Sequence, residues 1–410
     1  NQEIAYSADS FSTYAIAFMD VQYIEISTAE ELQNVKNRTD SSKQVFKLMS
    51  DIDLQGLTWE GFDIGELDGN GYSIKNISIT NINCEGMENL STDFVAFFRR
   101  ASKIKNLKFE NVNIEGNFAG NDNVLRIGLV GNLFGDAVVS DIEIEGLTIN
   151  VTVGGEEAFP HIHLGGLVAE TSSGIIQNVR IEQSDILVNL THGKIYAGGL
   201  VGGDVGVQNR IQRSIFDGEI EINALRTDET AENHICCGGI ASEGELSQCI
   251  NLGEIRIFAN NASVIAGGVV GNVENHSVSQ LANYGTLNIE QRIFPDSVPD
   301  SRSASMAAVS VGGLVGQAGG DDEIEYASIL KDSYNVGDIV LNVYSDWLSR
   351  VTTGNVGNIL GRTEEYYGIE NCYNLGEIDI TRYHEDGELV EENIVAERTG
   401  QLIGFSGVED

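Results

Sequence analysis

Apolar and polar residues alternate in short segments that recur along most of the chain. Examples are "SDIEIEGLTI" from Ser140, "QCINLGEIRI" from Gln248 and "NCYNLGEIDI" from Asn371. A period of two is typical of a β-strand with one buried face. After residue 60, no segment carries the 3.6-residue apolar stripe of a substantial helix. The pattern therefore predicts an all-β protein built from many short strands.

A glycine-rich string precedes most of these segments. It reads "GGLVG" at 198–202 and at 312–316, with related strings at 127–131, 165–169, 238–242, 267–271, 357–361 and 400–404. Aligning the segments that follow gives a polar column, Asn76, Asn106, Asp141, Asn178, Ser214, Cys249, Leu281, Ser333 and Cys372. The eight steps from residue 76 to residue 372 average 37 residues. Strings and segments therefore form one repeat.

Two apolar columns accompany the polar one. The first contains Ile77, Leu107, Ile142, Val179, Ile215, Ile250, Ala282, Tyr334 and Tyr373. The second contains Ile82, Val112, Leu147, Ile186, Ile220, Ile255, Leu287, Ile339 and Ile378. Short strands in such a repeat can bury their faces only by stacking on the next copy. We therefore predict a β-solenoid with one coil per repeat, in which Ile215, Ile250 and Ile378 point into one continuous core.

The repeat resembles a known family. The "GGLVG" strings followed by "CYNLGEI"-type segments resemble the GLUG repeats of bacterial surface proteins. The strings "IEISTAEELQNVKN" (24–37), "FKLMSDIDL" (46–54) and "GELDGNGYSIKNISI" (65–79) are similar to the start of GLUG-bearing β-helices, including the non-catalytic N-terminal part of immunoglobulin A1 metallopeptidases. The resemblance implies a right-handed parallel β-helix that is secreted or displayed on a cell surface, and it implies no known activity.

Some segments depart from the repeat. Residues 1–22 are interpreted as an N-terminal strand segment, the end of a preceding surface module. Residues 23–60 are interpreted as a cap and entry, in which Ser27-Thr28-Ala29-Glu30 is a capping-box pattern that opens a short helix to about Asn37. Residues 61–410 form the GLUG-repeat β-helix of about nine coils. We expect the chain to be part of a longer multidomain polypeptide.

Composition and charge narrow the function. The chain has 47 Gly and 3 Pro, which suits glycine turns between strands that need every backbone N–H. It carries 24 Lys and Arg against 62 Asp and Glu, a formal net charge of −38. Binding to nucleic acid or to anionic membranes needs a positively charged surface. The sequence also contains no run of 18 consecutive apolar residues, the length that a membrane-spanning helix needs. We therefore expect no nucleic-acid partner and no membrane insertion.

The cysteines and histidines do not form a recognisable catalytic or metal motif. The five cysteines, Cys84, Cys236, Cys237, Cys249 and Cys372, contain no CxxC pair, so buried free thiols are expected. None of the six histidines lies in an HExxH motif. His161 and His163 share a strand face but lack an identifiable third ligand, so surface histidines are expected. The acid pairs and basic residues of β-helix polysaccharide hydrolases and lyases are also not found in a convincing arrangement.

The candidate binding residues lie in insertions into the repeat. Insertions around 291–310 and 342–353 occur at the same stage of successive coils, so they are expected on the same side. Tyr344, Trp347 and Arg350 are residue types common in interface hot spots, although Trp347 could instead pack its loop against the solenoid. Asp321, Asp322 and Glu323 form the candidate calcium site, calcium being the one cofactor considered.

The predicted function is a non-enzymatic extracellular β-helix module of a bacterial cell-surface or secreted protein. It would act as adhesin, stalk or interaction domain for an extracellular protein or glycan. Two alternatives stay open, a carbohydrate-active β-helix enzyme and a non-catalytic segment of a larger secreted peptidase.

Overall fold

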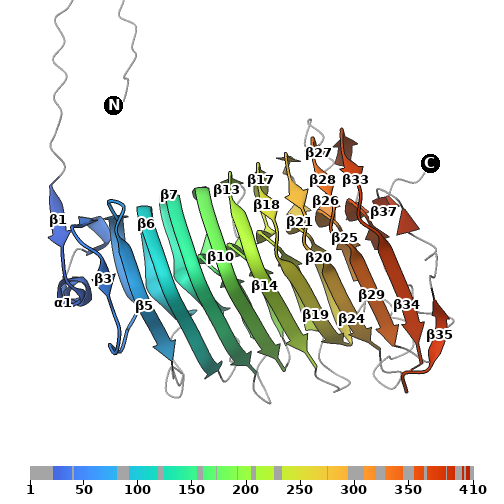
Figure 1. Ribbon diagram of the computed structural model, residues 1–410, viewed down its shortest axis with the longest axis horizontal. Coiled ribbons are helices and arrows are strands. Elements are labelled where there is room, and N and C mark those ends of the chain that lie inside the picture. Colours follow the sequence, from blue (N-terminus) through green and yellow to red (C-terminus); the bar gives the residue numbers. More distant parts are fainter. Residues whose placement is uncertain are drawn as a thin grey trace, which may run out of the picture.

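The computed structural model describes most of the repeat region. The described residues are 22–38, 41–80, 92–118, 124–154, 160–171, 173–191, 193–204, 209–225, 233–274, 276–293, 309–319, 328–344, 355–363, 367–384, 386–392, 399–400 and 403–406. They form an elongated stack of parallel strands, with α1 (Ala29–Gln33) at one end and β35 (Leu389–Glu392) at the other (Figure 1). The predicted fold class, an all-β parallel solenoid with a short N-terminal helix, is confirmed. Within the described residues, no helix is long and apolar enough to cross a membrane.

Short N-terminal strands lead into three long strands that each run through several faces of the solenoid. The N-terminal strands are β1 (Tyr23–Ile26), β2 (Val45–Leu48), β3 (Ile52–Asp53), β4 (Phe62–Asp68) and β5 (Ser73–Thr80). They stack onto β6 (Thr92–Phe118), which is followed by β7 (Val124–Val153) and β10 (Gly174–Leu190). From there on the coils are divided into shorter strands, which form five parallel stacks.

Stacks I and II are joined in each coil by the glycine-rich string, with the stack I strand first along the chain and the stack II strand second. Stack I continues from β7 through β8 (His161–Gly165), β11 (Lys194–Gly198), β15 (Asn233–Gly238), β20 (Ala262–Gly267), β25 (Val309–Gly312), β30 (Asn355–Gly357) and β36 (Thr399–Gly400). Stack II contains β9 (Val168–Thr171), β12 (Val201–Asp204), β16 (Ala241–Glu243), β21 (Val270–Glu274), β26 (Val315–Gly319), β31 (Leu360–Thr363) and β37 (Ile403–Ser406).

Stacks III, IV and V all continue from β10. Stack III contains β13 (Asn209–Gln212), β17 (Glu245–Ser247), β22 (Val278–Ser279), β27 (Ser328–Lys331) and β32 (Tyr367–Glu370). Stack IV contains β14 (Ile215–Ala224), β18 (Ile250–Asn251), β23 (Ala282–Asn283), β28 (Tyr334–Asn335) and β33 (Tyr373–Asn374). Stack V contains the second half of β14, then β19 (Glu254–Asn260), β24 (Leu287–Arg292), β29 (Ile339–Tyr344) and β34 (Ile378–Tyr383).

The N-terminal helix begins one residue later than the sequence pattern indicated. Thr28 is the N-cap, and it forms the capping box with Glu31 rather than Ser27 with Glu30. A 3₁₀ turn (Asn34–Asn37) continues the helix to the predicted end, and a second one (Ser41–Lys43) follows. Leu32 and Val35 are buried, so the helix and turn contribute directly to the core beside the first coil.

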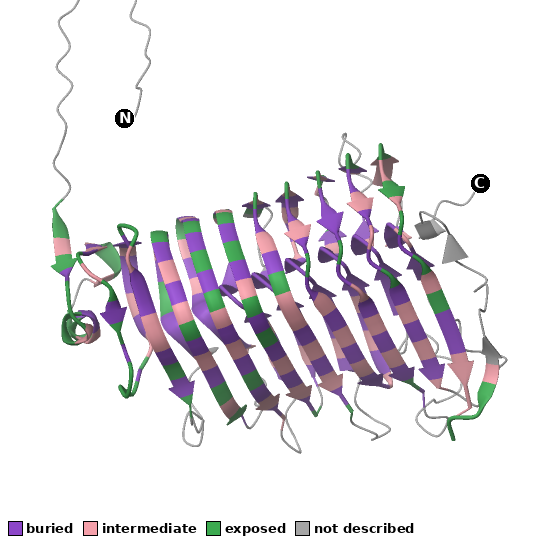
Figure 2. Ribbon diagram, viewed as in Figure 1, coloured by how far each residue is buried: buried purple, intermediate pink, exposed green. Residues whose placement is uncertain are grey.

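Columns of branched apolar side chains fill the inside of the solenoid. The longest runs through nine paired positions, Ile79, Ile114, Ile149, Ile186, Ile220, Ile255, Leu287, Ile339 and Ile378. All but the last are at most 2% exposed, and alternate residues on each strand face outward (Figure 2). The second predicted apolar column is confirmed from Ile186 to Ile378. Val112 and Leu147 pair with each other, but they lie two residues before Ile114 and Ile149, which occupy this column. Ile82 lies outside the described residues.

The residues of the first predicted apolar column from Ile215 to Tyr373 stack on one another as predicted, but they lie on the outer face and not in the core, and the predicted step from Val179 to Ile215 is wrong. Val179 lies next to Ser214, not Ile215, and Ser214 lies next to Cys249. Ile215 and Ile250 are therefore partly exposed on the outside, and Ser214, Cys249, Leu281 and Ser333 occupy the core position. Near the N-terminus, Ile77 likewise pairs with Val112, not with Leu107. The alignment slipped by one residue between Val179 and Ile215, because it assumed that apolar residues point inward and asparagines outward.

The cysteines behave as predicted where they are described. Cys236, Cys237 and Cys249 are free and buried, and Cys372 is a free thiol that is half-buried in the last coil. Burial raises the pKa of Cys237 and of Cys249 to about 12, so neither forms a reactive thiolate near neutral pH. Cys84 lies outside the described residues.

Candidate interaction surface

A column of buried asparagines underlies the most unusual surface of the protein. Asn251, Asn283, Asn335 and Asn374 occupy equivalent positions in stack IV, each two residues before a glycine. The Nδ2 atom of each of the first three donates to the Oδ1 atom of the next, at 2.8–2.9 Å. Each amide also bonds the backbone of its glycine; for example, Asn283 Nδ2 donates to Gly285 O at 2.8 Å, and Gly285 N donates to Asn283 Oδ1 at 3.2 Å. We call this column the asparagine ladder.

The asparagine ladder explains why polar residues face the core here. Asn251, Asn283 and Asn335 are fully buried, and both ends of each amide are hydrogen-bonded. A buried amide is tolerated when all its hydrogen bonds are made. Because side chains alternate along a strand, an inward asparagine forces its two neighbours outward. Those neighbours are mostly apolar, so the ladder places apolar side chains in solvent.

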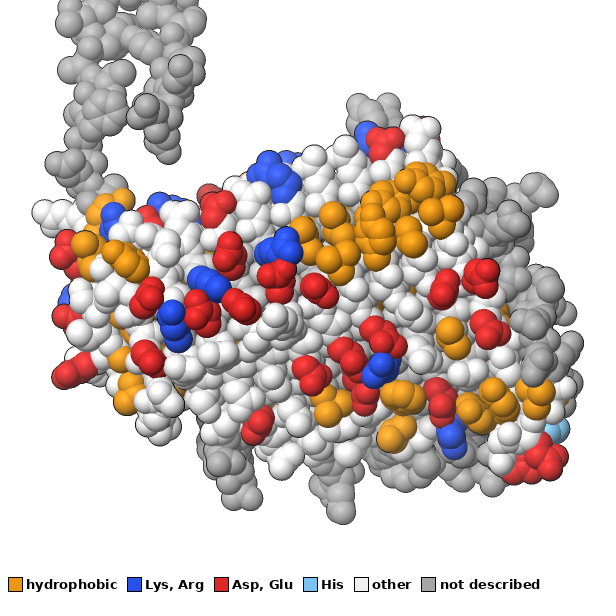
Figure 3. Space-filling model, viewed as in Figure 1, with side chains coloured by type: hydrophobic (Ala, Val, Ile, Leu, Met, Phe, Trp, Pro, Cys, Tyr) orange, Lys and Arg blue, Asp and Glu red, His pale blue; other side chains and the backbone are white. Residues whose placement is uncertain are grey.

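These outward neighbours form a continuous surface, which we call the apolar strip. It consists of Ile250, Leu252, Tyr284, Tyr334, Val336, Tyr373 and Leu375. The exposed fractions of its four most exposed members are 42% for Leu252, 46% for Tyr284, 53% for Tyr373 and 71% for Leu375. In the space-filling view, hydrophobic side chains gather in a band that crosses the last coils (Figure 3). Contiguous apolar surface of this kind usually marks an interaction site.

The tyrosines of the apolar strip are held in place by one another. The rings of Tyr334 and Tyr373 are stacked, with centroids 5.2 Å apart and planes at 9°. The hydroxyls of Tyr284 and Tyr334 are 2.5 Å apart, and this hydrogen bond raises the pKa of Tyr334 to about 12. Rings fixed in this way lose little further freedom when a partner binds, which favours affinity.

Acidic and polar residues border the apolar strip. Glu254, Asp338 and Glu377 follow the glycines of the repeat on one side, and Asp332 lies on the other. Figure 3 shows red side chains next to the hydrophobic band. With a net charge of −38 on the whole chain, this border favours a partner that is neutral or basic where it meets the strip.

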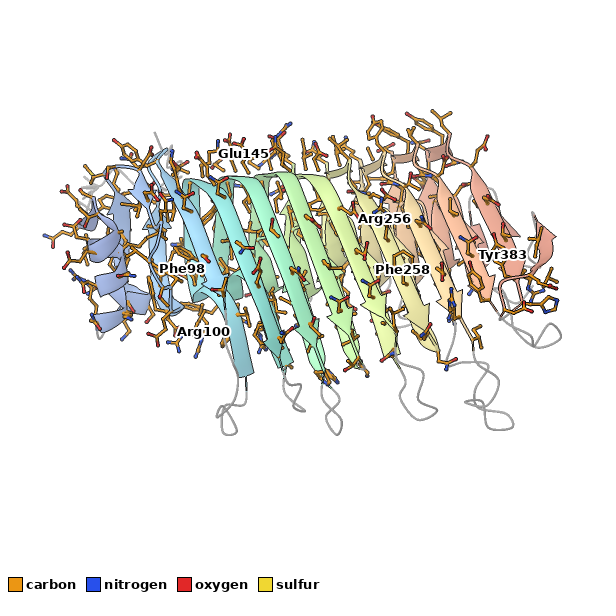
Figure 4. The ribbon with its side chains drawn as sticks, turned by 60° about the horizontal axis from the view of Figure 1, so that its bottom comes forward. Phe98, Arg100, Glu145, Arg256, Phe258 and Tyr383 are labelled. Carbon is orange, nitrogen blue, oxygen red and sulfur yellow. The ribbon has the colours of Figure 1, made fainter. Side chains whose placement is uncertain are left out.

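The site residues predicted from the sequence are only partly described. Tyr344 ends β29, where its ring stacks on Tyr383 at 4.7 Å between centroids and lies 4.6 Å from the Arg292 guanidinium. Figure 4 shows Tyr383 at the end of the last long strand. Trp347 and Arg350 lie outside the described residues, and so do Asp321, Asp322 and Glu323 of the calcium hypothesis. The strands before the two insertions end at Arg292 and Tyr344, which pair with each other in neighbouring coils. This agrees with the prediction that the insertions occur at the same stage of the repeat.

A second polar cluster lies at the glycine corner between stacks I and II. Arg126 of β7 and His163 of β8 both contact Glu170 of β9, with Arg126 Nη2 at 2.7 Å and His163 Nδ1 at 2.7 Å from its Oε2 atom. Asn132 Nδ2 donates to the other carboxylate oxygen at 3.0 Å. Burial opposes ionisation of Glu170, but these hydrogen bonds outweigh it and hold its pKa below the ordinary range. Because both oxygens are occupied, Glu170 is poorly placed to act as a general base.

Aromatic and histidine side chains extend this corner cluster along the axis. The Tyr196 ring lies 5.3 Å from that of His163 and 5.8 Å from that of His234, measured between centroids. Burial raises the pKa of Tyr196 to about 12. His161 lies beside Lys194 in the neighbouring coil. Within the part of the chain that the structure describes, no three His, Cys, Asp or Glu residues are grouped as metal ligands.

The partly buried His234 gives the protein a predictable acid sensitivity. Burial, with Lys194 nearby, lowers the pKa of His234 below the ordinary value of 6.5. Below about pH 6.5, His234 therefore binds a proton more readily in the unfolded chain than in the folded protein. As a result, the free energy of unfolding decreases as the pH falls below this value. Between pH 7.5 and 5.5, wild type should lose up to about 1 kcal/mol more of its unfolding free energy than His234→Gln. Urea titrations at both pH values measure this. Tyr196→Phe is the control and should lose as much unfolding free energy between pH 7.5 and 5.5 as wild type, since the Tyr196 phenol does not titrate in this range. If His234→Gln lost as much as wild type, His234 would not be the source of the acid sensitivity.

Comparisons with known proteins add little to this picture. No protein-family model matches the sequence, and no curated protein matches it. Among solved structures, the chain is similar to the 1.30 Å crystal structure of a candidate immunoglobulin A1 protease from Bacteroides ovatus. The sequence identity is 18% and the TM-score is 0.44, over 86% of this chain and 85% of that one. A likeness this distant carries no argument about the site or the function.

Sequence reasoning missed the apolar strip, although its signal was present. The pattern Asn-x-Gly recurs at 251–253, 283–285, 335–337 and 374–376, always after an apolar or aromatic residue. An asparagine repeated at the same stage of four coils is better explained by a stacked amide column than by a solvent-facing column.

Proposed function

We propose that this protein is a non-enzymatic, extracellular interaction module of the GLUG-repeat type, belonging to a bacterial cell-surface or secreted protein. The observation that carries the proposal is the apolar strip, an exposed row of tyrosine and aliphatic side chains on a rigid solenoid. Tyrosine and leucine side chains at this exposure form an apolar patch of the kind that marks interaction sites, and tyrosine is among the residues enriched in interface hot spots.

The solenoid supports this function mechanically. Each coil pairs in parallel register with the next, so the strip residues keep fixed spacings along the axis. A partner can therefore contact several coils at once without first ordering them. The same rigidity suits a stalk, and the acidic surface keeps an elongated β protein soluble.

Adhesion to extracellular ligands tests the proposal. Wild-type protein would be applied to immobilised mucin, fibronectin and collagen and to a glycan array. The test variant carries Tyr284→Ser, Tyr373→Ser and Leu375→Ser. The control variant carries Met49→Ser, Leu57→Ser and Leu225→Ser, three exposed apolar residues outside the strip. We expect wild type and control to bind at least one ligand, and the strip variant to lose at least tenfold in affinity.

Two results would contradict the proposal. One is equal binding by the strip variant and wild type, and the other is no binding by wild type to any ligand. Release of reducing sugar ends from an arrayed glycan would instead favour the carbohydrate-active alternative.

A further inference from the structure

The apolar strip runs along the solenoid axis as two columns of side chains. The residues before the ladder asparagines form the first column, Ile250, Ala282 (buried), Tyr334 and Tyr373. The residues after them form the second column, Leu252, Tyr284, Val336 and Leu375. Positions two residues apart on a strand are separated by about 6.6 Å, and three steps between coils span about 14 Å. Outward side chains project at right angles to the stacking direction, so the strip faces sideways, and a further coil would lengthen it without covering it.

Carboxylates line the strip mainly on one side. Glu254, Asp338 and Glu377 occupy the outward position two residues beyond the second column. Glu254 is paired with Arg256 at 2.9 Å, whereas Asp338 and Glu377 are exposed and form no ion pair within the described part of the chain. The equivalent position beyond the first column contains only one acid, Asp332. The strip therefore offers unpaired negative charge along one long side.

The packing of the tyrosine rings favours a polypeptide partner over a glycan. Tyr334 and Tyr373 stack with their planes at 9°, and Tyr284 meets Tyr334 at 87°. These contacts use ring faces on which a pyranose would stack. The surface that remains consists largely of ring edges and of aliphatic side chains such as Leu252 and Leu375, which suit the side chains of another protein.

We infer that the apolar strip binds an amphipathic α-helix of a partner protein, which lies along the solenoid axis and carries lysine or arginine on one flank of its apolar stripe. This inference deepens the proposed function and rests on it. A helix rises about 5.4 Å per turn, close to the roughly 4.8 Å between coils, so apolar side chains one turn apart contact successive coils. The basic flank lies over Asp338 and Glu377, and this sets the direction in which the helix runs.

A designed peptide is the probe for this helix. The sequence QLKQLLKQLKQLLK, amidated and labelled with a fluorophore at its N-terminus, forms a helix about 21 Å long with its leucines on one face and its lysines on one flank. It would be titrated with the wild-type chain while fluorescence anisotropy is recorded, in about 50 mM and about 500 mM salt. We expect saturable binding that weakens at least threefold at the higher salt, because the ion pairs at the border are screened.

Two further peptides test the charge and the helix separately. QLEQLLEQLEQLLE keeps the apolar stripe and reverses the charge of the flank. QLKQLLKPLKQLLK keeps the leucines and the lysines, but its central proline destabilises the helix by about 3 kcal/mol. We expect each to bind at least tenfold more weakly than the probe. The proline peptide also controls for the general attraction of cations to a chain with a net charge of −38.

Variants of the protein locate the binding surface. The strip variant described above should weaken binding of the probe at least tenfold. Asp338→Asn with Glu377→Gln should weaken it by about three- to tenfold in low salt and by less in high salt. The control is Glu25→Gln with Glu115→Gln, which removes the same charge from exposed positions of β1 and β6 and should leave binding unchanged.

The outcomes separate this inference from the proposed function. No saturable binding of the probe, equal binding of the proline peptide, or full binding by the strip variant would overturn the helical partner. If the probe did not bind but the strip variant lost adhesion to an arrayed glycan, the helical partner would be wrong and the interaction function would stand. The peptide comparisons use wild-type protein, so they do not depend on the folding of any variant.

Discussion

Replacing Asn283 with alanine is expected to destabilise the protein by about 3–5 kcal/mol, because unsatisfied buried polar groups cost about 1–3 kcal/mol each. The substitution removes both hydrogen bonds to the Gly285 backbone and both bonds to the neighbouring amides. The side chains of Asn251 and Asn335 and the N–H of Gly285 each lose a partner inside a buried polar network, where an unpaired group is costly.

Urea unfolding followed by circular dichroism measures this loss. Asn288→Ala is the matched control, since it removes the same side chain from the outer face of the next strand, and it should change stability by less than about 0.5 kcal/mol. If both variants unfolded at the same urea concentration, the asparagine ladder would contribute nothing and its role here would be wrong.

Replacing Gly268 with alanine is expected to have an effect at least as large. A Cβ atom at this position would lie 2.1 Å from Gly313 O and 2.5 Å from the Asn283 side-chain carbon Cγ. Both contacts are with atoms that are fixed by the next coil and by the asparagine ladder, so the backbone would have to move. Overpacking of a core typically costs about 1–3 kcal/mol, and more where the added atom clashes with the backbone. We therefore expect the free energy of unfolding to fall by more than about 3 kcal/mol, or the variant to fail to fold.

The control for this glycine is Gly135→Ala. Gly135 has a φ of +69°, and no atom lies within 4 Å of the added Cβ. Its substitution should destabilise the protein only by the free energy of holding alanine in the left-handed backbone conformation, about 1–2 kcal/mol. Thermal unfolding of both variants makes the comparison. A Gly268→Ala protein as stable as Gly135→Ala would show that the coils do not approach as closely as described.

The repeat and its strands could be predicted because stacking imposes one pattern on every coil. The column from Ile186 to Ile378 was predicted correctly because apolar residues occupy it in each copy. The glycine corners were also visible, since two consecutive glycines before an apolar pair recur where neighbouring coils meet at backbone distance.

The surface could not be predicted by the same rule. At Ile215 and Ile250, a rule that places apolar residues inside assigns the wrong face, because the inward Asn251 is satisfied by local bonds to Gly253 and by a bond to Asn283 that exists only once the next coil is stacked beside it. Such a network is a property of several coils together. The contact of Arg126 with Glu170 is hidden in the same way, since it joins residues 44 positions apart across a corner.

Distances between spin labels test the central claim, that each repeat is one coil of a single solenoid in parallel register. Asp379, Glu221, Asn150 and Glu115 belong to one outward column, with four, six and seven coil steps separating the last three from Asp379. At about 4.8 Å per step, pulsed electron paramagnetic resonance should give separations of about 19, 29 and 34 Å. Separations that do not rise in proportion to the number of steps would contradict the account.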